Sequence, residues 1–388
     1  MKIGIEGQRL YRKKKHGMDM VALELIKNLQ KIDTVNEYVI FVKPDEDDTC
    51  IPLTSNFKIV PLRSKFGYPG WEQIALPRAA KEEGCDLLHC TSNTGPLFSK
   101  VPLITTLHDI IYLESISIFK KEGTWYQKLG NMYRRWFVPG VIKKSKKVIT
   151  VSNYEKKRIN SYFKFKDNRL TAIYNGVGSH FKKVRNEVVL QAIKEKYGLP
   201  DNFFFFLGNT DPKKNTRGVL EAFGNFNEAV SEKYQLVMLD YDEHELQKLL
   251  HSIGMPQLRK HILLLGYVPN MELPAIISQC RIFLYPSLRE SFGIPILEGM
   301  ACGVPVITSN TSSMPEVAGE EAALIIDPFK PEEITAAIHT LVDDQQLAKV
   351  LAEKGIQRAK NFSWSAMSQN VLALYKEVYQ EIKQDQYD

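Results

Sequence analysis

The sequence predicts an α/β protein made of two doubly wound domains, in which helices cover both faces of a parallel sheet. Short apolar runs alternate with longer helical patterns through the first half of the chain, and the same alternation begins again at about residue 203. A length of 388 residues also favours two domains over one. The turn Asn175-Gly176-Val177-Gly178 lies between the two series, so we expect domains at 1–180 and 181–364.

The expected strands are the short apolar runs. In the first half these are Lys2–Glu6, Glu37–Val42, Leu87–Cys90, Leu103–Thr106, Val148–Val151 and Leu170–Tyr174. In the second half they are Phe203–Leu207, Gln235–Leu239, Ile262–Gly266, Ile282–Tyr285, Val304–Thr308 and Ala323–Ile326. A long helix is expected over Ser365–Lys383, because its apolar residues recur every three or four positions.

Composition is that of an ordinary globular protein, with 44% hydrophobic and 25% charged residues. The apolar runs are far shorter than the roughly 18 residues that a membrane-spanning helix needs, and no secretion signal can be drawn. We therefore expect a cytoplasmic protein, either free or peripheral on the inner face of the membrane. Five cysteines without a C-x-x-C pair indicate neither a disulfide framework nor a zinc site.

Charge is divided unequally between the two halves. Residues 1–180 hold 30 Lys and Arg against 18 Asp and Glu, whereas residues 181–388 hold 21 against 27. The basic half therefore favours an anionic partner. Basic residues cluster at 12–16 and 143–147, and Arg134-Arg135-Trp136-Phe137 joins charge to aromatic rings, which suits an interfacial helix on anionic lipid. A solvated helix face is the alternative. A nucleic-acid partner is not expected, because no DNA- or RNA-binding motif accompanies the charge.

The segment 285–301 indicates which ligand groups the protein binds. A strand ends at Tyr285, a loop with Glu290 and Gly293 follows, and Pro295 suits the first turn of a helix that carries Glu298. Free amides at a helix N-terminus bind phosphate, and glycine lets the backbone approach closely. The two carboxylates fit this site if they accept hydrogen bonds from a sugar and a ribose. The alternative is a surface glutamate followed by a favourable helix-dipole charge.

The text from Phe283 to Glu316, in which Glu290 and Glu298 are separated by seven residues, resembles the core motif of the family-4 retaining glycosyltransferases. Four further segments look like parts of the same family. They are its phosphate loop at 208–215, its H-D loop at 106–109, its interdomain turns at 150–153 and 175–177, and the turn Phe362-Ser363-Trp364 that opens the terminal helix. The match extends from residue 103 onward.

The resemblance implies the GT-B fold: two Rossmann-like domains facing across a cleft, with the helix at 365–388 crossing back to the first domain. It implies that the first domain binds the acceptor and the second binds the donor. The implied reaction is a retaining, metal-independent transfer of a hexose from a nucleoside diphosphate sugar. The acceptor would be a glycan or a lipid-linked glycan, in surface polysaccharide or lipopolysaccharide biosynthesis. No cofactor is expected.

By the same resemblance, Lys214 binds the donor diphosphate, where its charge replaces a divalent metal. Glu290 binds the transferred sugar and Glu298 the ribose, while His108 contacts the donor sugar across the cleft. The remaining donor contacts are expected from Gly17, Lys213, Ser291, Phe292, Gly293 and Ile294. We count His108, Lys214 and Glu290 as the catalytic residues. No carboxylate is clearly placed as a nucleophile, so we expect front-face substitution.

The chain departs from the family pattern at several positions. Asn209 and Lys213 stand where arginine is usual, so the second cation comes from Lys213 or Arg217, and Gly17 alone remains of a glycine-rich loop. The pair Asp240 and Asp242 invites a metal interpretation, but we interpret Asp242 as a helix N-cap. Two other functions remain open on the same fold: a nucleotide-sugar epimerase or hydrolase, and a non-catalytic anion-binding protein.

Overall fold

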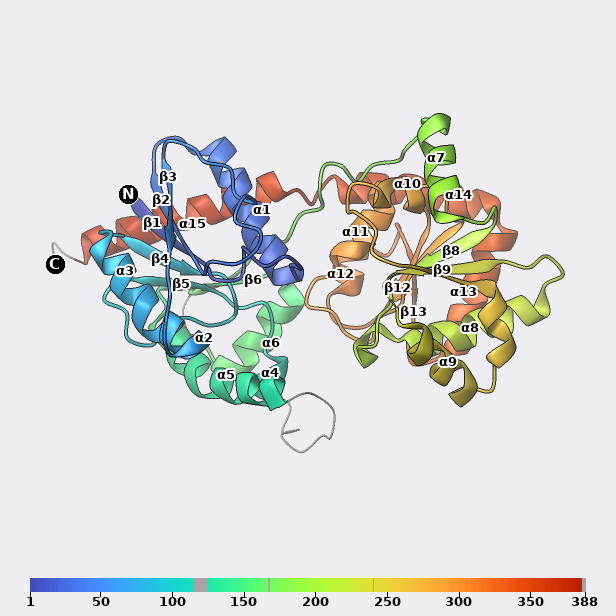
Figure 1. The fold of residues 1–388 in the computed structure, drawn as a ribbon, viewed down its shortest axis with the longest axis horizontal. Helices are drawn as coiled ribbons and strands as arrows, with labels where there is room; N and C mark the ends of the chain where they lie inside the picture. The colour runs from blue at the N-terminus through green and yellow to red at the C-terminus, as the bar shows by residue number, and fades with distance from the viewer. Residues whose placement is uncertain (115–124, 167, 240, 386–388) are drawn as a thin grey trace. The chain divides into compact units, whose positions relative to one another are not determined.

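The computed structural model describes residues 1–114, 125–166, 168–239 and 241–385. The chain forms two compact units (Figure 1). The N-terminal unit comprises Met1–Asn175 and Trp364–Asp388, and the C-terminal unit comprises Gly176–Ser363. The chain thus passes from one unit to the other at 175 and 176, where the sequence analysis placed the change at 180. The return of the terminal helix to the N-terminal unit is confirmed.

The N-terminal unit is built on a sheet of seven parallel strands in the order β3-β2-β1-β4-β5-β6-β7. The strands are β1 (Lys2–Gly7), β2 (Glu37–Val42), β3 (Phe57–Pro61), β4 (Leu87–Cys90), β5 (Leu103–Thr106), β6 (Lys147–Thr150) and β7 (Leu170–Ala172). Strand β3 was not predicted from the sequence. This strand lies at the edge of the sheet and is only partly buried, so it lacks the continuous apolar run of a central strand.

Helices cover both faces of this sheet. They are α1 (Gly17–Ile32), α2 (Gly67–Gly70), the π-helical turn η1 (Trp71–Ala75), α3 (Leu76–Glu82), α4 (Ile111–Glu114), α5 (Trp125–Lys144), α6 (Asn153–Phe163) and α15 (Trp364–Gln384). Successive residues of β4 point to opposite faces. Leu88 and Cys90 pack in a cluster with α3, whereas His89 Nδ1 lies 2.6 Å from the hydroxyl of Tyr375 in α15. Helix α15 also packs against α1 (Figure 1).

The C-terminal unit has six parallel strands in the order β10-β9-β8-β11-β12-β13. They are β8 (Phe203–Phe206), β9 (Gln235–Leu239), β10 (Ile262–Leu265), β11 (Ile282–Tyr285), β12 (Val306–Ser309) and β13 (Leu324–Ile326). Numbered within the unit, the order is 3-2-1-4-5-6, which is the Rossmann arrangement. Two doubly wound units are therefore confirmed.

The helices of the C-terminal unit pack on an aromatic core. They are α7 (Glu187–Tyr197), α8 (Thr216–Ala229), α9 (Glu243–Ser252), α10 (Leu273–Ile277), α11 (Ile294–Ala301), α12 (Met314–Ala318), α13 (Pro331–Asp343) and α14 (Gln345–Ala359), with 3₁₀ turns η3 (Pro212–Lys214) and η4 (Pro256–His261). Phe204 and Phe206 of β8 face α8 and α13. Phe205 faces the other way, toward Phe283, and Gly299 of α11 lies against the ring of Phe283.

No helix among the described residues is both long enough and apolar enough to cross a bilayer. All five cysteines are free thiols, and only Cys50 is not fully buried.

Candidate active site

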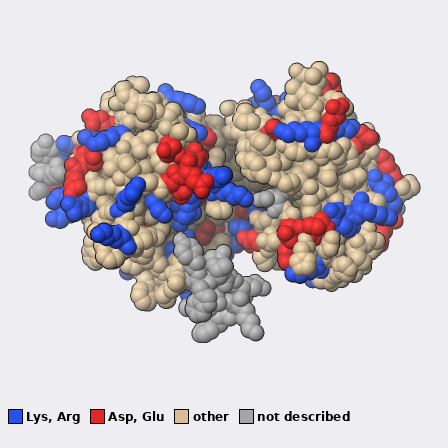
Figure 2. Space-filling model, viewed as in Figure 1, with Lys and Arg blue, Asp and Glu red and all other residues tan. Residues whose placement is uncertain are grey.

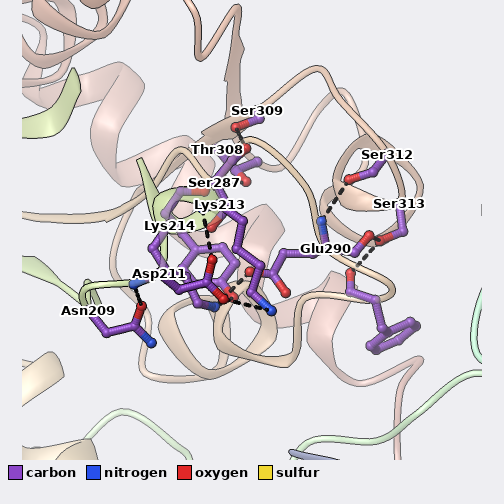
Figure 3. A network of polar contacts seen from close by, with 12 residues as sticks. Asn209, Asp211, Lys213, Lys214, Ser287, Glu290, Thr308, Ser309, Ser312 and Ser313 are labelled. Atoms are coloured by element: carbon purple, nitrogen blue, oxygen red, sulfur yellow. Dashed lines mark hydrogen bonds and ion pairs between the residues drawn. The ribbon is translucent and has the colours of Figure 1, made fainter. Parts of the chain in front are cut away.

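The candidate site lies where the strand order of the C-terminal unit reverses. Strands β8 and β11 are adjacent and parallel, but the chain leaves them toward opposite sides of the sheet. Ligands of open α/β sheets bind at this point, beyond the carboxyl ends of the strands. The loop after β8 carries Lys213 and Lys214, and the loop after β11 carries Glu290 (Figure 3). The fold therefore brings together two predicted segments that are far apart in the sequence.

The loop after β8 has a rigid backbone. A side chain on Gly208 would meet the ring of Phe206 at 2.2 Å, so only glycine fits there. Asp211 caps the turn η3 by accepting a hydrogen bond of 3.1 Å from the Lys213 amide. Asn209 accepts one of 2.9 Å from the Asp211 amide, so this departure from the family pattern shapes the loop. Asn215 donates to the carbonyls of Pro286 and Pro328, which ties the loop to its neighbours.

Lys214 and Glu290 form an ion pair at the centre of the site. Lys214 Nζ lies 2.6 Å from Glu290 Oε1 and 2.8 Å from the hydroxyl of Tyr285, and it stands 4.8 Å from the centre of the Tyr285 ring. The side chains of Lys214 and Glu290 are 16% and 13% exposed. Burial and then the charge of Glu290 raise the pKa of Tyr285 well above its ordinary value. Tyr285 therefore remains a neutral partner of the pair.

Hydroxyl groups from the end of β12 and the residues after it fix the backbone of the Glu290 loop (Figure 3). Ser309 donates to the carbonyl of Ser287 at 2.6 Å, and Ser313 donates to the carbonyls of Glu290 and Phe292. Ser312 accepts a hydrogen bond of 3.0 Å from the Glu290 amide. No role was predicted from the sequence for these serines or for Tyr285. A run of hydroxyl residues directly after a buried strand is the signal that could have indicated them.

Gly293 and helix α11 complete the loop. Gly293 has a φ of +99°, a backbone conformation that other residues rarely adopt. It allows the chain to turn into α11, where Pro295 stands in the first turn. Helix α11 begins at Ile294, and Ser291 lies three residues before it in the loop; both residues are partly buried. Phe292 is fully buried and packs edge-on against Phe362, so its side chain belongs to the core.

Glu298 lies within α11 and is partly buried. Among the residues that the structure describes, none donates a hydrogen bond to its carboxyl group. Burial raises the pKa of Glu298 to about 7, and the charge of Lys214 opposes this effect. The group therefore has acceptor capacity that the protein itself leaves unused, which suits a ligand hydroxyl.

The other two cations that the sequence analysis considered have acidic partners. Lys213 lies 3.5 Å from Asp211. Arg217 lies on α8 and pairs with Glu221 at 2.9 Å. Lys213 thus stays within the loop, whereas Arg217 is held on the helix.

His108 and Gly17 belong to the N-terminal unit. His108 follows β5 and is 5% exposed, and its Nε2 lies 3.0 Å from the carbonyl of Thr91. Because a carbonyl only accepts, Nε2 carries the proton. Burial lowers the pKa of His108, which keeps the ring neutral. Gly17 is exposed at the start of α1, with no atom within 4 Å of the position that a side chain would take.

Asp240 lies outside the described residues. Asp242 caps α9 by accepting a hydrogen bond of 2.9 Å from the Glu245 amide, as predicted. Within the described ranges, no three His, Cys, Asp or Glu side chains gather in a way that could hold a metal ion.

Glu298 should make the stability of the C-terminal unit depend on pH. Because its pKa rises from 4.5 to about 7 on folding, its contribution is fully present below about pH 4.5 and is lost as the pH rises toward 7. Glu298→Gln cannot lose a proton there. We expect its free energy of unfolding, relative to the wild type, to increase by roughly 1–3 kcal/mol between pH 4.5 and pH 8.

Urea denaturation across this pH range measures the effect. Glu353→Gln, which removes an exposed carboxyl group from α14 of the same unit, is the control. A pH profile for Glu298→Gln that parallels the profile of the wild type would contradict the interpretation.

Comparison with known sequences identifies both units. Residues 191–358 match the family model described as Glycosyl transferases group 1, and residues 16–180 match Glycosyltransferase Family 4. The chain is 30% identical over 274 residues to the O-antigen chain mannosyltransferase B of Escherichia coli, covering 70% of each protein. It is 27% identical over 223 residues to the serotype-specific mannosyltransferase WbdA of Escherichia coli. That match covers 56% of this chain and only 27% of the longer WbdA.

A solved structure has the same fold. The Anabaena protein Alr3699/HepE, determined in complex with UDP and glucose, matches with a TM-score of 0.74 at 17% identity, over 97% of this chain and 99% of that one. The fold is GT-B, as the resemblance implied. The sequence matches and the fold together show that the chain belongs to the family-4 glycosyltransferases.

Proposed function

We propose that this protein transfers a hexose from a nucleoside diphosphate sugar to a glycan or lipid-linked glycan, with retention of configuration and without a metal ion. The observation that carries the proposal is the group at the end of β8 and β11: a lysine paired to one glutamate, with a second glutamate that has no donor among the described residues. A diphosphate, a sugar hydroxyl and a ribose hydroxyl would give each of these three groups a partner.

In the proposed reaction, the donor diphosphate displaces Glu290 from Lys214. Lys214 then neutralises the charge that grows on the leaving diphosphate as the bond from its oxygen to the sugar C1 breaks. The acceptor oxygen bonds to C1 from the same face, and its proton passes to the leaving phosphate oxygen. The released Glu290 accepts a hydrogen bond from the sugar, and Glu298 accepts from the ribose. The amides at 291–294 lie at the start of α11 and suit the phosphates.

We take the hexose to be mannose and the process to be surface polysaccharide or lipopolysaccharide biosynthesis. The support is that both Escherichia coli relatives are named mannosyltransferases and that the name of one of them includes the O-antigen chain. We place the reaction in the cytoplasm or on the inner face of the membrane, where nucleotide sugars and lipid carriers meet.

Removal of the Lys214 charge should abolish most of the transfer. Lys214→Gln keeps a hydrogen-bond donor beside Glu290 but cannot neutralise the leaving group, so we expect kcat to fall by about 100-fold to 1000-fold. The measurement is release of nucleoside diphosphate from a panel of nucleoside diphosphate mannoses, with and without added glycan acceptors, and the anomeric configuration of the product is read by NMR.

Lys248→Gln on α9 removes an exposed lysine of the same unit and should leave kcat unchanged. Full activity of Lys214→Gln would contradict the role of Lys214, and loss of wild-type activity with EDTA would contradict the metal-free reaction. Sugar release that needs no acceptor would indicate a hydrolase.

We also propose that helix α5 rests on an anionic membrane. Leu129, Met132 and Trp136 are 56%, 45% and 74% exposed, and their spacing places them on one face of the helix. Arg134 and Arg135 accompany them on α5. Basic and apolar side chains on one helix suit the interface of an anionic bilayer.

Two lysines of the cluster at 143–147 have a structural role. Lys147 pairs with Glu377 and Glu381 of α15 at 2.6 and 3.2 Å, and Lys146 pairs with Asp385 at 2.7 Å. These two lysines hold the terminal helix against the N-terminal unit, so the face of α5 is the better place to test membrane binding.

Replacement of the three apolar residues of α5 by serine should weaken membrane binding at least tenfold, because each loses apolar area that would enter the interface. Co-sedimentation with phosphatidylglycerol vesicles measures it. The control replaces three exposed apolar residues of the C-terminal unit, Val188, Tyr267 and Met271, by serine. Equal binding of the two triple variants would contradict the proposal.

A further inference from the structure

The N-terminal unit contains a basic cavity of about 640 Å³, which is a typical size for a small-molecule site. It lies beyond the carboxyl ends of three neighbouring strands. Arg12 follows β1, Lys43 follows β2 directly, and Arg63 follows β3. The edge of an α/β sheet at which ligands bind therefore carries three cations around one cavity.

The three cations have no acidic partners among the residues that the structure describes. Neither Arg12, Lys43 nor Arg63 forms an ion pair with any residue in the described part of the chain, and no carboxylate lines the cavity. In the same basic cluster, Lys13 and Lys15 do pair, with Glu46 and Asp47. Figure 2 shows Lys and Arg side chains gathered at several places on the N-terminal unit, with a compact acidic group among them. Unpaired cations around a cavity attract an anion with more than one charge.

Acidic residues in this part of the unit do not line the cavity. Glu72 is buried and accepts hydrogen bonds from Tyr68 at 2.8 Å and from Tyr133 at 2.6 Å. Asp45 and Asp48 line an adjoining cavity, which shares only Pro44 and Arg63 with the basic one. No carboxylate in the lining of the basic cavity therefore neutralises its positive charge.

Apart from the polar side chains of Gln8 and Ser64, the rest of the lining is apolar or aromatic. Tyr68 and Trp71 contribute rings, and Pro44 and Pro69 add apolar surface. Trp71 is held by a hydrogen bond of 3.0 Å from its indole nitrogen to the carbonyl of Leu62. Such a surface packs against a sugar ring or a hydrocarbon chain, while guanidinium groups grip phosphate oxygens in pairs.

We propose that this cavity binds a diphosphate or phosphate group of the glycosyl acceptor, with Arg12, Lys43 and Arg63 on the phosphate and the aromatic side chains on the group attached to it. This inference rests on the proposed function, because it names the chemical class of the acceptor. The phosphate would belong either to a polyprenyl carrier or to a water-soluble sugar phosphate.

The test is calorimetric titration of the full chain with inorganic pyrophosphate. The wild type should bind at two sites, one at Lys214 and one in the basic cavity. The double variant Arg12→Gln/Arg63→Gln should bind at least tenfold more weakly at one of them, and Lys214→Gln should lose the other. Lys65→Gln removes an exposed cation that lies two residues after Arg63 but does not line the cavity, and it should behave as the wild type.

The same titration can overturn the inference. Unchanged pyrophosphate binding in the double variant would contradict the proposed phosphate site in the cavity. Loss of all pyrophosphate binding in Lys214→Gln would contradict it as well. Nucleoside diphosphate binding provides the separate readout for the donor site. If the double variant keeps this binding, the proposed function is retained even when the proposed phosphate site in the cavity is wrong. If Lys214→Gln keeps nucleoside diphosphate binding while the double variant loses one pyrophosphate site, the assignment of the donor site is wrong and the phosphate site in the cavity is supported.

Competition then identifies the source of the phosphate. Displacement of pyrophosphate from the cavity by a polyprenyl diphosphate in phosphatidylcholine vesicles assigns it to a lipid carrier. Displacement by mannose 1-phosphate in solution assigns it to a soluble acceptor. If neither ligand displaces pyrophosphate, the proposal is wrong. It is also wrong if phosphatidylglycerol vesicles without the diphosphate displace pyrophosphate equally well, because this would indicate general charge attraction.

Discussion

The ion pair between Lys214 and Glu290 is the interaction on which the organisation of the candidate site depends. It joins the loops after β8 and β11, which meet only because these two strands lie side by side. Both side chains are largely withdrawn from water, so each charge needs the other. Removing one partner of a buried pair leaves an uncompensated charge, which destabilises a protein by about 3–5 kcal/mol. The pair therefore holds the loops in place before a ligand arrives.

Hydrogen bonds around the ion pair hold the backbone of both loops in place when the contact between Lys214 and Glu290 breaks. Asn215 fixes the first loop through two carbonyls, and Ser309 and Ser313 fix the second. Leu288 donates to the carbonyl of Lys213 at 2.7 Å, which links the loops directly. A ligand can thus replace one partner of the ion pair while the frame remains, and this preorganisation is what electrostatic catalysis requires.

Much of the fold follows from local pattern. The run of four phenylalanines at 203–206 predicts a strand buried on both faces, and the apolar spacing in 365–383 predicts the face on which Met367, Val371 and Tyr375 are buried. Asp242 as an N-cap is equally local. The strand β3 was missed because an edge strand is partly exposed, and the π-helical turn at 71–75 has no spacing signal of its own.

The site was predictable only in its separate parts. The motif indicates Lys214, Glu290 and Glu298, but no pattern shows that Lys214 and Glu290 pair, because they are 76 positions apart in the sequence. The same reason hid the pairing of Lys147 with α15 and the cavity formed by Arg12, Lys43 and Arg63. Contacts between distant segments depend on strand order, which a local pattern does not record.

A crystal structure of the protein with a nucleoside diphosphate mannose bound would test the roles of Lys214, Glu290 and Glu298 together. We expect a diphosphate oxygen within hydrogen-bond distance of Lys214 Nζ, ribose hydroxyls on Glu298 and a sugar hydroxyl on Glu290, with the contact between Lys214 and Glu290 broken. A nucleotide bound away from the loops that follow β8 and β11, with that contact still intact, would contradict these roles.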